Sequence, residues 1–344
     1  RCGYTCHTHT NYRCNDSMTK PWQRENTDWM RDAKFGVMTH TIVNPPGAPA
    51  MEMSPQQWNK IVDAFDVERF ARTIADTGAG YLFFTIGQNS GYYCSPNETY
   101  DGLVKVTPSR LSRRDLVGEV AAALRARGVR TVAYLPSHAP SKHHEAIEGL
   151  RCTPEWDGGR WGLIPGSYLR LHPVDQRLTE FQRNWEAVIR EWSLRWGDNV
   201  SGWWIDGCYY ADIMYRSEDE PNFRTFAQAM KAGNPDSLVA FNPGVKMPII
   251  CVTEYEDYTA GEVNDLPTPH NSLTFGRFVD GAQLQVLSFL GQSWCIGQPR
   301  FPDALAVEYT RFINSFGGAV TWDVPVDLAG NIPDAFLRQL AKMK

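Results

Sequence analysis

The chain has 344 residues, of which 42 % are hydrophobic and 21 % are charged, and it contains 28 Gly, 22 Pro and 12 Trp. This composition excludes a disordered, collagen-like or coiled-coil protein, because it supplies enough apolar surface to offset the entropy of the chain. The formal net charge of −5 argues against a nucleic acid as partner. The chain also lacks an apolar run that could span a bilayer, so we expect no membrane partner.

Residues 1–27 form a cysteine-rich N-terminal arm ahead of the first predicted element. Three of the eight cysteines, Cys2, Cys6 and Cys14, crowd a stretch in which no hydrophobic core could surround them. Disulfides are therefore predicted there. A zinc site is the alternative, but the spacing lacks the Cys-x2-Cys pairs of most structural zinc sites. A buried free thiol is the alternative for three deeper cysteines: Cys208, Cys251 and Cys295.

Disulfides and sequons together indicate a secreted glycoprotein. Sequons begin at Asn15, Asn97 and Asn199, and each is a predicted glycosylation site. The chain opens with Arg1 and contains no signal peptide, so we expect a mature extracellular protein whose signal has been removed.

In chain order, short apolar runs alternate with amphipathic stretches. The predicted strands are residues 34–40, 81–86, 131–135, 202–206, 238–241, 249–253, 284–290 and 319–322. The predicted helices are residues 54–64, 66–77, a helix from the cap Ser112 to Gly128, 174–196, 223–232, 304–316 and 334–343. This alternation predicts a single α/β catalytic domain, a (β/α)8 TIM-like barrel over residues 28–344. A doubly wound sheet is the alternative, but no Gly-rich nucleotide loop follows the first strand.

In such a barrel the chemistry lies at the C-terminal ends of the strands. Carboxylates, amides and aromatic rings dominate there, whereas Lys and Arg are scarce. This set favours an oligosaccharide or polysaccharide, because amides and carboxylates bind hydroxyl groups and Trp stacks on sugar rings. No cofactor or metal is predicted. The predicted sugar-binding residues at strand ends include His40, Gln88, Asn89, His138, Trp294 and Trp322.

Asp206 is the sharpest feature, because it directly follows the strand residues Trp203, Trp204 and Ile205. The alternative is that Asp206 caps the next helix or pairs with a cation. Glycosidases use two carboxyl groups, about 5 Å apart in retaining enzymes. The candidates for the second carboxyl group are Glu254, Glu256 and Glu262.

Five segments resemble, in the same order, those of the α-L-fucosidases of glycoside hydrolase family 29. These segments are Ala33–His40, Phe65–Thr85, Arg114–Tyr134, Trp204–Gly207 and Gly317–Pro333. The resemblance covers about residues 28–343 and implies a secreted retaining exo-glycosidase.

The resemblance also implies residue roles. Asp206 would be the nucleophile, His40 would bind sugar hydroxyls, and Tyr134 and Trp204 would line the pocket. Residues 257–262 are similar to the family segment that carries the acid/base, so Glu262 is the first choice for that role. Glu254 and Glu256 are the reserves.

Two departures from the family pattern bear on specificity. Residues 87–92 replace a segment with two histidines that hold fucose, so the preferred sugar is expected to differ from fucose. The β-sandwich domain that usually follows is not expected. A carbohydrate-binding pseudoenzyme on the same barrel is the main alternative. A metal-dependent hydrolase using His138, His143, His144 and His172 is a weaker one.

Overall fold

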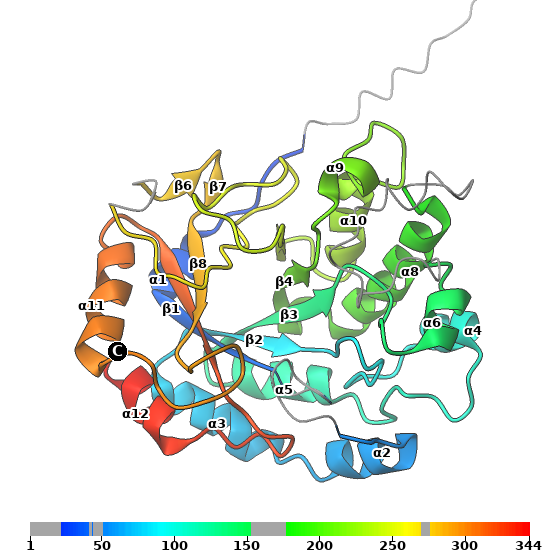
Figure 1. Cartoon of the computed structure of the whole chain (residues 1–344), viewed down its shortest axis with the longest axis horizontal. Helices are drawn as coiled ribbons and strands as arrows, with labels where there is room; N and C mark the ends of the chain where they lie inside the picture. The colour runs from blue at the N-terminus through cyan, green and yellow to red at the C-terminus, as the bar shows by residue number, and fades with distance from the viewer. Residues whose placement is uncertain (1–21, 41–42, 44–50, 153–176, 270–275) are drawn as a thin grey trace, which may run out of the picture.

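The structure, a computed structural model, describes residues 22–40, 43, 51–152, 177–269 and 276–344. Seven parallel strands pair in the order β5-β4-β3-β2-β1-β9-β8 and form one curled sheet (Figure 1). The strands of this sheet are β1 (Phe35–Thr39), β2 (Tyr81–Thr85), β3 (Arg130–Pro136), β4 (Val200–Asp206), β5 (Leu238–Phe241), β8 (Gln285–Phe289) and β9 (Ala319–Val324). A separate antiparallel hairpin joins β6 (Phe278–Val279) and β7 (Ala282–Gln283).

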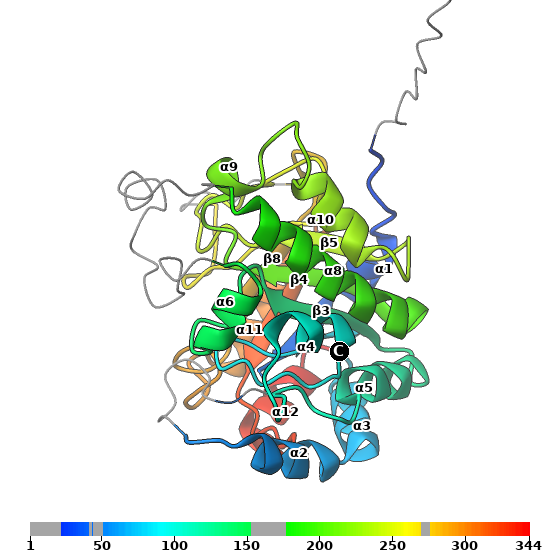
Figure 2. The ribbon, with the colours of Figure 1, turned by 90° about the vertical axis from the view of Figure 1, so that its right-hand side faces the viewer.

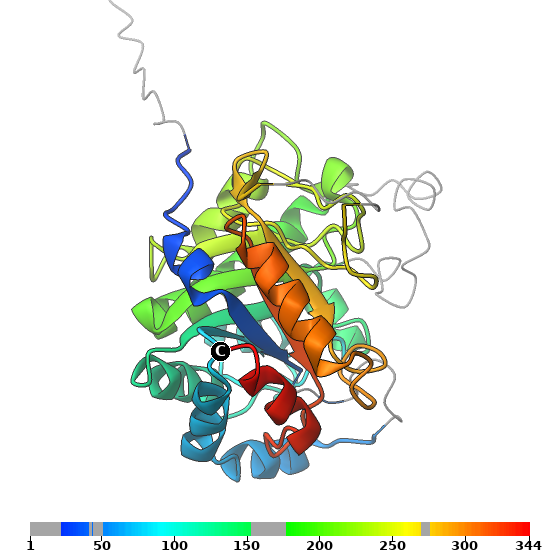
Figure 3. The ribbon, with the colours of Figure 1, turned by 90° about the vertical axis from the view of Figure 1, so that its left-hand side faces the viewer.

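Helices surround the curled sheet, most of them on its outer face (Figure 1). They are α1 (Asp28–Ala33), α2 (Pro55–Asp63), α3 (Val67–Thr77), α4 (Glu98–Val104), α5 (Leu116–Arg125), α6 (His144–Gly149), α8 (Thr179–Trp196), α9 (Ala211–Met214), α10 (Phe223–Met230), α11 (Asp303–Asn314) and α12 (Asp334–Ala341), with a short 3-10 turn η2 (Gly197–Asn199). Helix α8 packs against α10, and α3 packs against α5 (Figure 2). Helix α11 packs against β9 on the other side (Figure 3).

The edge strands β5 and β8 are bridged by the extended segment 257–263. The Asp257 N–H donates to the Val239 carbonyl of β5 over 2.8 Å, and the Val263 N–H donates to the Leu287 carbonyl of β8 over 2.9 Å. The Leu287 N–H donates back to Gly261 over 2.9 Å. Gly261 is required there, because a Cβ at this position would lie 1.9 Å from the Gln285 carbonyl oxygen. The architecture is thus an α/β fold with a curled parallel sheet, compatible with a TIM-like catalytic domain.

Side chains alternate between the two faces of every strand, and this alternation decides which of them reach the interior of the curl. On β4, Trp203 joins the core between sheet and helices, whereas Trp204 joins the inner core. Tyr134 on β3 also belongs to the inner core, while Trp322 on β9 belongs to the outer one. Hydrophobic burial therefore fixes the face that each strand-end residue presents.

The sequence predicted most elements within a few residues, and three local expectations were wrong. Residues 249–253 form no strand, and the segment that bridges the sheet edges lies further along the chain. Helix α5 begins after Asp115, whose carboxylate accepts from the Gly118 N–H over 3.0 Å, and Ser112 does not cap it. Asn97 does not offer a glycosylation site, because its buried amide caps α4 and donates to the Val188 carbonyl over 2.9 Å.

The arm and the cysteines are only partly described. Cys2, Cys6, Cys14 and the sequon at Asn15 lie outside the described residues. Residues 22–27, which the sequence assigned to the arm, run beside the bridging segment, where the Arg24 guanidinium donates to the Glu256 carbonyl over 2.7 Å. Three deeper cysteines carry free thiols: Cys208 and Cys295 are buried, as the alternative expected, whereas Cys251 is half-buried. No helix of the described ranges is long and apolar enough to cross a membrane.

Candidate active site

Asp206 ends β4 and is held by two side-chain donors. The Tyr134 hydroxyl donates to its Oδ2 over 2.5 Å, and the Asn242 amide donates to its Oδ1 over 2.9 Å. Burial, followed by the charge of Asp206, raises the pKa of Tyr134 well above its ordinary value, so the phenol remains a donor. Gly207 leaves the strand with a φ of 78°, which turns the chain away from the carboxylate. Asp206 itself remains partly exposed.

Glu262 faces Asp206 across the Asn242 side chain. The Asn242 nitrogen that binds Asp206 also donates to Oε2 of Glu262 over 2.6 Å. The two carboxyl oxygens therefore lie within about 5.5 Å of each other, since both bonds meet at one nitrogen atom. This upper limit agrees with the roughly 5 Å between the carboxyl groups of retaining glycosidases.

The environment of Glu262 favours its protonated form. Burial, followed by the negative charge of Asp206, raises the pKa of Glu262 to about 7. The hydrogen bond from Asn242 and the nearby His40 oppose this rise. Glu262 can thus carry a proton near neutrality, as a general acid requires.

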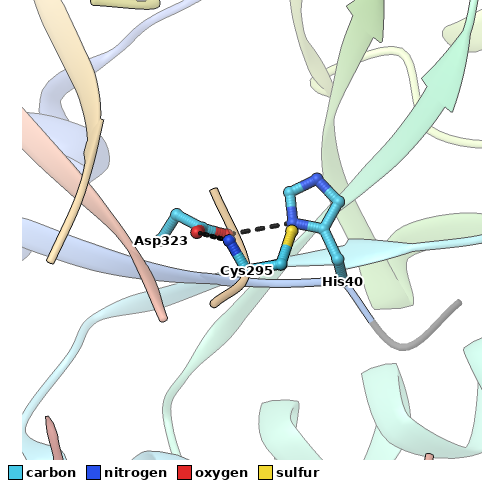
Figure 4. A group of neighbouring side chains, drawn as sticks. All are labelled: His40, Cys295 and Asp323. Atoms are coloured by element: carbon cyan, nitrogen blue, oxygen red, sulfur yellow. Dashed lines mark hydrogen bonds and ion pairs between the residues drawn. The ribbon is translucent and has the colours of Figure 1, made fainter. Parts of the chain in front are cut away.

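His40 follows β1 and reaches the same cluster. Its ring lies edge-to-face against Tyr134 with 5.3 Å between the centroids. Its Nδ1 lies 2.9 Å from Oδ1 of Asp323, whose Oδ2 accepts from the Cys295 N–H over 2.7 Å (Figure 4). In the neutral ring, donation from Nδ1 to the Asp323 carboxylate leaves Nε2 on the far side as an acceptor.

Aromatic and amide groups form the wall around the carboxyl pair. Trp204 stacks on Tyr134 with 5.4 Å between centroids and 17° between planes, and its Nε1 donates to the Ala260 carbonyl over 3.0 Å. The Gln88 amide donates to the Tyr134 hydroxyl over 2.6 Å. Trp294 is partly exposed and packs against the inner core and edge-to-face on Phe289.

His138 lies on the loop after β3, close enough to Asp206 for the charge of that carboxylate to affect its pKa. Its Nδ1 donates to the Ala139 carbonyl over 2.6 Å. Burial lowers the pKa of His138, and the charge of Asp206 only partly offsets this effect. Asn89 sits one residue beyond Gln88 and is partly exposed, with its backbone carbonyl accepting from Lys142 over 2.8 Å. It makes no described side-chain bond to the carboxyl pair.

Three sequence-predicted site residues do not reach the cluster. Trp322 is fully buried beneath α11, where its Nε1 donates to the Thr310 hydroxyl over 3.0 Å, so the prediction that it stacks on a sugar is wrong. Glu256 is fully buried and accepts from the backbone N–H groups of Phe241 and Val252, so its role as reserve acid/base is also wrong. Glu254 is exposed and accepts from Thr253 over 3.1 Å, without a described contact to Asp206.

The structure adds three residues whose contribution the sequence did not single out. Asn242 joins the two carboxyl groups, Asp323 orients His40, and Tyr209 responds to the charges of both Asp206 and Glu262. Asn242 directly follows β5 and Asp323 lies near the end of β9, so their strand-end positions were the available signal. For Tyr209, the proximity to Gly207 in the chain was the only hint.

A cavity of about 700 Å³ lies at the opposite end of the sheet. Its lining includes Trp29, Arg125, Arg130, Asp198 and the sequon residue Asn199. Arg125 and Asp198 neutralise each other at 2.7 Å, and both are largely exposed. The N-terminal ends of barrel strands are not where barrel enzymes place their chemistry.

Comparison with known proteins agrees with this geometry. Residues 51–344 match the family model described as Alpha-L-fucosidase. The chain belongs to the alpha-L-fucosidase family. It is accordingly a glycoside hydrolase, a class of enzyme that commonly uses a pair of carboxyl groups.

Solved structures share the fold of this family member. The endo-fucoidan hydrolase P5AFcnA from glycoside hydrolase family 107 superposes with a TM-score of 0.65 at 15 % identity, covering 92 % of this chain and 91 % of that one. The endo-fucoidan hydrolase MfFcnA4 gives a TM-score of 0.66 at 19 % identity, over 92 % of this chain and 53 % of that one.

The alpha-L-fucosidase AlfC from Lactobacillus casei in complex with alpha-L-fucose product gives a TM-score of 0.62 at 16 % identity, over 92 % of this chain and 97 % of that one. No curated protein sequence matches the chain significantly.

Proposed function

We propose that the protein is a secreted, retaining exo-glycosidase that acts on α-L-fucosides or closely related sugars, with Asp206 as nucleophile and Glu262 as acid/base. The observation that carries the proposal is the single Asn242 amide that binds both carboxyl groups, at 2.9 Å and 2.6 Å. This shared donor keeps the pair at the separation that a double displacement needs.

In the first step, a carboxylate oxygen of Asp206 attacks the anomeric carbon of the sugar. The bond from that carbon to the leaving oxygen breaks, and Glu262 gives its proton to this oxygen. A glycosyl ester on Asp206 results. In the second step, Glu262 takes a proton from water, the water oxygen attacks the anomeric carbon, and Asp206 leaves as a carboxylate. Two inversions retain the configuration.

The surrounding residues explain how the sugar would be held. His40 Nε2 is an acceptor for a sugar hydroxyl, since Nδ1 is committed to Asp323. Gln88 spends an N–H on Tyr134, which leaves its carbonyl oxygen for a second hydroxyl. Trp294 offers an apolar ring at the mouth. Because amides stand where two histidines are expected from the family pattern, we propose a preference shifted away from fucose.

The closure of the sheet between β5 and β8 is part of the same proposal. Segment 257–263 hydrogen-bonds to β8 and, at Asp257, to β5, so we infer that it acts as the eighth member of a (β/α)8 barrel over residues 28–344. This closure brings Glu262 opposite Asp206, which lies on the fourth strand.

Trapping of the covalent intermediate tests the proposal. The protein is incubated with activated 2-deoxy-2-fluoro glycosides of α-L-fucose and of D-galacto-configured sugars, because the fluorine slows the second step. We expect a mass increase of one glycosyl group on the peptide that carries Asp206. Proton NMR of a turned-over aryl glycoside should show first release of the retained anomer. Release of the inverted anomer, or a label on another carboxyl group, would overturn the assignment.

A further inference from the structure

Three side chains of types that commonly bind metal ions meet beside the carboxyl pair, and the proposed displacement uses no metal ion. His40 follows β1, Asp323 lies near the end of β9, and Cys295 lies on the turn after β8 (Figure 4). A nitrogen, a sulfur and an oxygen atom from these residues lie within 4.8 Å of one another. All three residues are buried.

The backbone at Cys295 is held in an unusual conformation that brings its thiol to this cluster. Its φ of 64° lies in the left-handed region, which residues with a Cβ rarely adopt. The Cys295 N–H donates to Asp323 over 2.7 Å, and backbone bonds between Ser293 and Ile296 close the turn around it. Such conformations persist where the surroundings impose them, and they gather at functional sites.

We propose that His40, Cys295 and Asp323 form a binding site for a divalent transition-metal cation, with Zn²⁺ as its type. Imidazole, thiolate and carboxylate are the ligands that Zn²⁺ takes in proteins, whereas Mg²⁺ and Ca²⁺ select oxygen atoms alone. A point equidistant from three atoms 4.8 Å apart lies about 2.8 Å from each of them. Zinc bonds of about 2.0–2.3 Å thus require each ligand to move by less than about 1 Å.

Binding changes the protons of two groups. The Cys295 thiol loses its proton to solvent as the sulfur binds the cation. At His40, the cation takes the Nδ1 position that now donates to Asp323, and the proton moves to Nε2. Nε2 then becomes a donor, where it was an acceptor toward the sugar. The cation is therefore a reversible inhibitor of the glycosidase, a consequence that rests on the proposed function, whereas the binding itself does not.

Cobalt spectroscopy on the full chain tests the binding. Co²⁺ replaces Zn²⁺ as probe, because a cysteine thiolate bound to it absorbs in the near ultraviolet. The wild type is compared with Cys295→Ser and with Cys251→Ser, which removes another free thiol that lies against Arg24 and Thr253. Comparing variants also cancels any cobalt bound by the cysteines and histidines before residue 15, which all three proteins share.

We expect one equivalent of thiolate-bound cobalt to be present in the wild type and in Cys251→Ser and to be missing in Cys295→Ser. Identical cobalt spectra in the wild type and Cys295→Ser would overturn the site. Circular dichroism checks folding, and Cys295→Ala replaces the serine variant if that protein is misfolded.

A Zn²⁺ titration of hydrolysis tests the inhibition, with each protein normalised to its own rate after chelation. The concentration for half-inhibition should rise at least tenfold in Cys295→Ser, and a chelator should restore the wild-type rate. Equal inhibition of both proteins would overturn the inhibitory role. A protein that binds cobalt through Cys295 and hydrolyses no glycoside would keep the metal site and contradict the proposed function instead.

Discussion

Carboxyl groups lie at or beside both ends of the bridging segment 257–263, and different kinds of groups bind them. Backbone N–H groups bind both Glu256, which directly precedes the segment, and Asp257, at its start. The Lys231 ammonium also lies 2.9 Å from Oδ2 of Asp257. Glu262, at the far end of the segment, is bound by the side chain of Asn242 and faces a second carboxyl group. The start of the segment joins β5 to the N-terminal residues, whereas its end opens toward the strand ends.

The contrast shows how the proposed catalytic carboxyl group differs from a structural one on the same segment. Backbone amides and an ammonium group satisfy Asp257 completely, so its role is to hold chain segments together. Glu262 shares its described donor, the Asn242 amide, with Asp206. Because the two carboxyl groups lie close together, the protonation of one affects that of the other. The groups that bind each carboxyl group, more than its burial, distinguish Asp257 from Glu262.

Removing the proposed nucleophile should have the largest effect. Asp206→Ala is expected to lower kcat/KM by about 10⁴-fold or more, because no other described carboxyl group can form the glycosyl ester with Glu262 as acid. The rate is measured on an aryl α-L-fucoside. Asp212→Ala is the matched control, since that aspartate on α9 is 85 % exposed and, among the described residues, pairs with Arg216. Turnover by Asp206→Ala at one hundredth of the wild-type rate would contradict the role.

Replacing the proposed acid should have the second largest effect. Glu262→Gln is expected to lower kcat/KM by about 10²–10⁴-fold for a leaving group that needs a proton, and much less for a dinitrophenyl group. Because the pKa of Glu262 is raised to about 7, the wild-type rate should fall as the pH rises above about 7 and the acid ionises. This alkaline limb should vanish in the variant.

Glu254→Gln is the control for the acid, because Glu254 is exposed and contacts its neighbour Thr253. Its profile should match that of the wild type. A wild-type limb that stays in Glu262→Gln and disappears in Glu254→Gln would reverse the assignment.

Beside the start of the segment, replacing Glu256 should reduce stability and leave activity unchanged. Glu256→Ala is expected to reduce the free energy of unfolding by about 2–4 kcal/mol, because the Phe241 and Val252 N–H groups lose their acceptors. The kcat per folded molecule should stay unchanged. Urea unfolding followed by fluorescence measures the first quantity, and active-site titration the second. A loss of kcat with full stability would place Glu256 in the chemistry.

The same residue predicts a pH dependence of stability. Burial raises the pKa of Glu256 to about 8, above its ordinary 4.5, so the folded state holds a proton that the unfolded state releases. Wild-type stability should therefore decline between about pH 5 and pH 8. Glu256→Ala should show a shallower decline over this range.

The smallest effect is expected at Asp323. Asp323→Asn should lower kcat/KM about tenfold, equivalent to about 1.4 kcal/mol, because an amide no longer fixes the proton of His40 on Nδ1. A positioning role predicts that the loss appears only with sugars that carry the hydroxyl bound by His40. The ratio of wild-type to variant rates should return to one for the matching deoxy sugar, while an equal loss on all substrates would indicate general damage.

Local patterns were sufficient to predict most elements and part of the site. A carboxylate after the buried run of β4 predicted Asp206, and strand-end positions predicted His40 and Gln88. Trp322 shows the limit, because it also stands near a strand end and yet faces α11. The apolar runs carry no alternation, so the sequence did not reveal which neighbour points inward.

The sequence by itself determined the composition class, the repeated strand and helix pattern, and the carboxylate after β4, since these depend on periodicity and on neighbours along the chain. Tertiary structure alone decided that Glu262 pairs with Asp206 and that Glu256 and Trp322 are packing residues. Residues 206, 242 and 262 meet through one amide although they are far apart in the chain. Such a meeting depends on the curl of the sheet and the register of its strands, which no local pattern encodes.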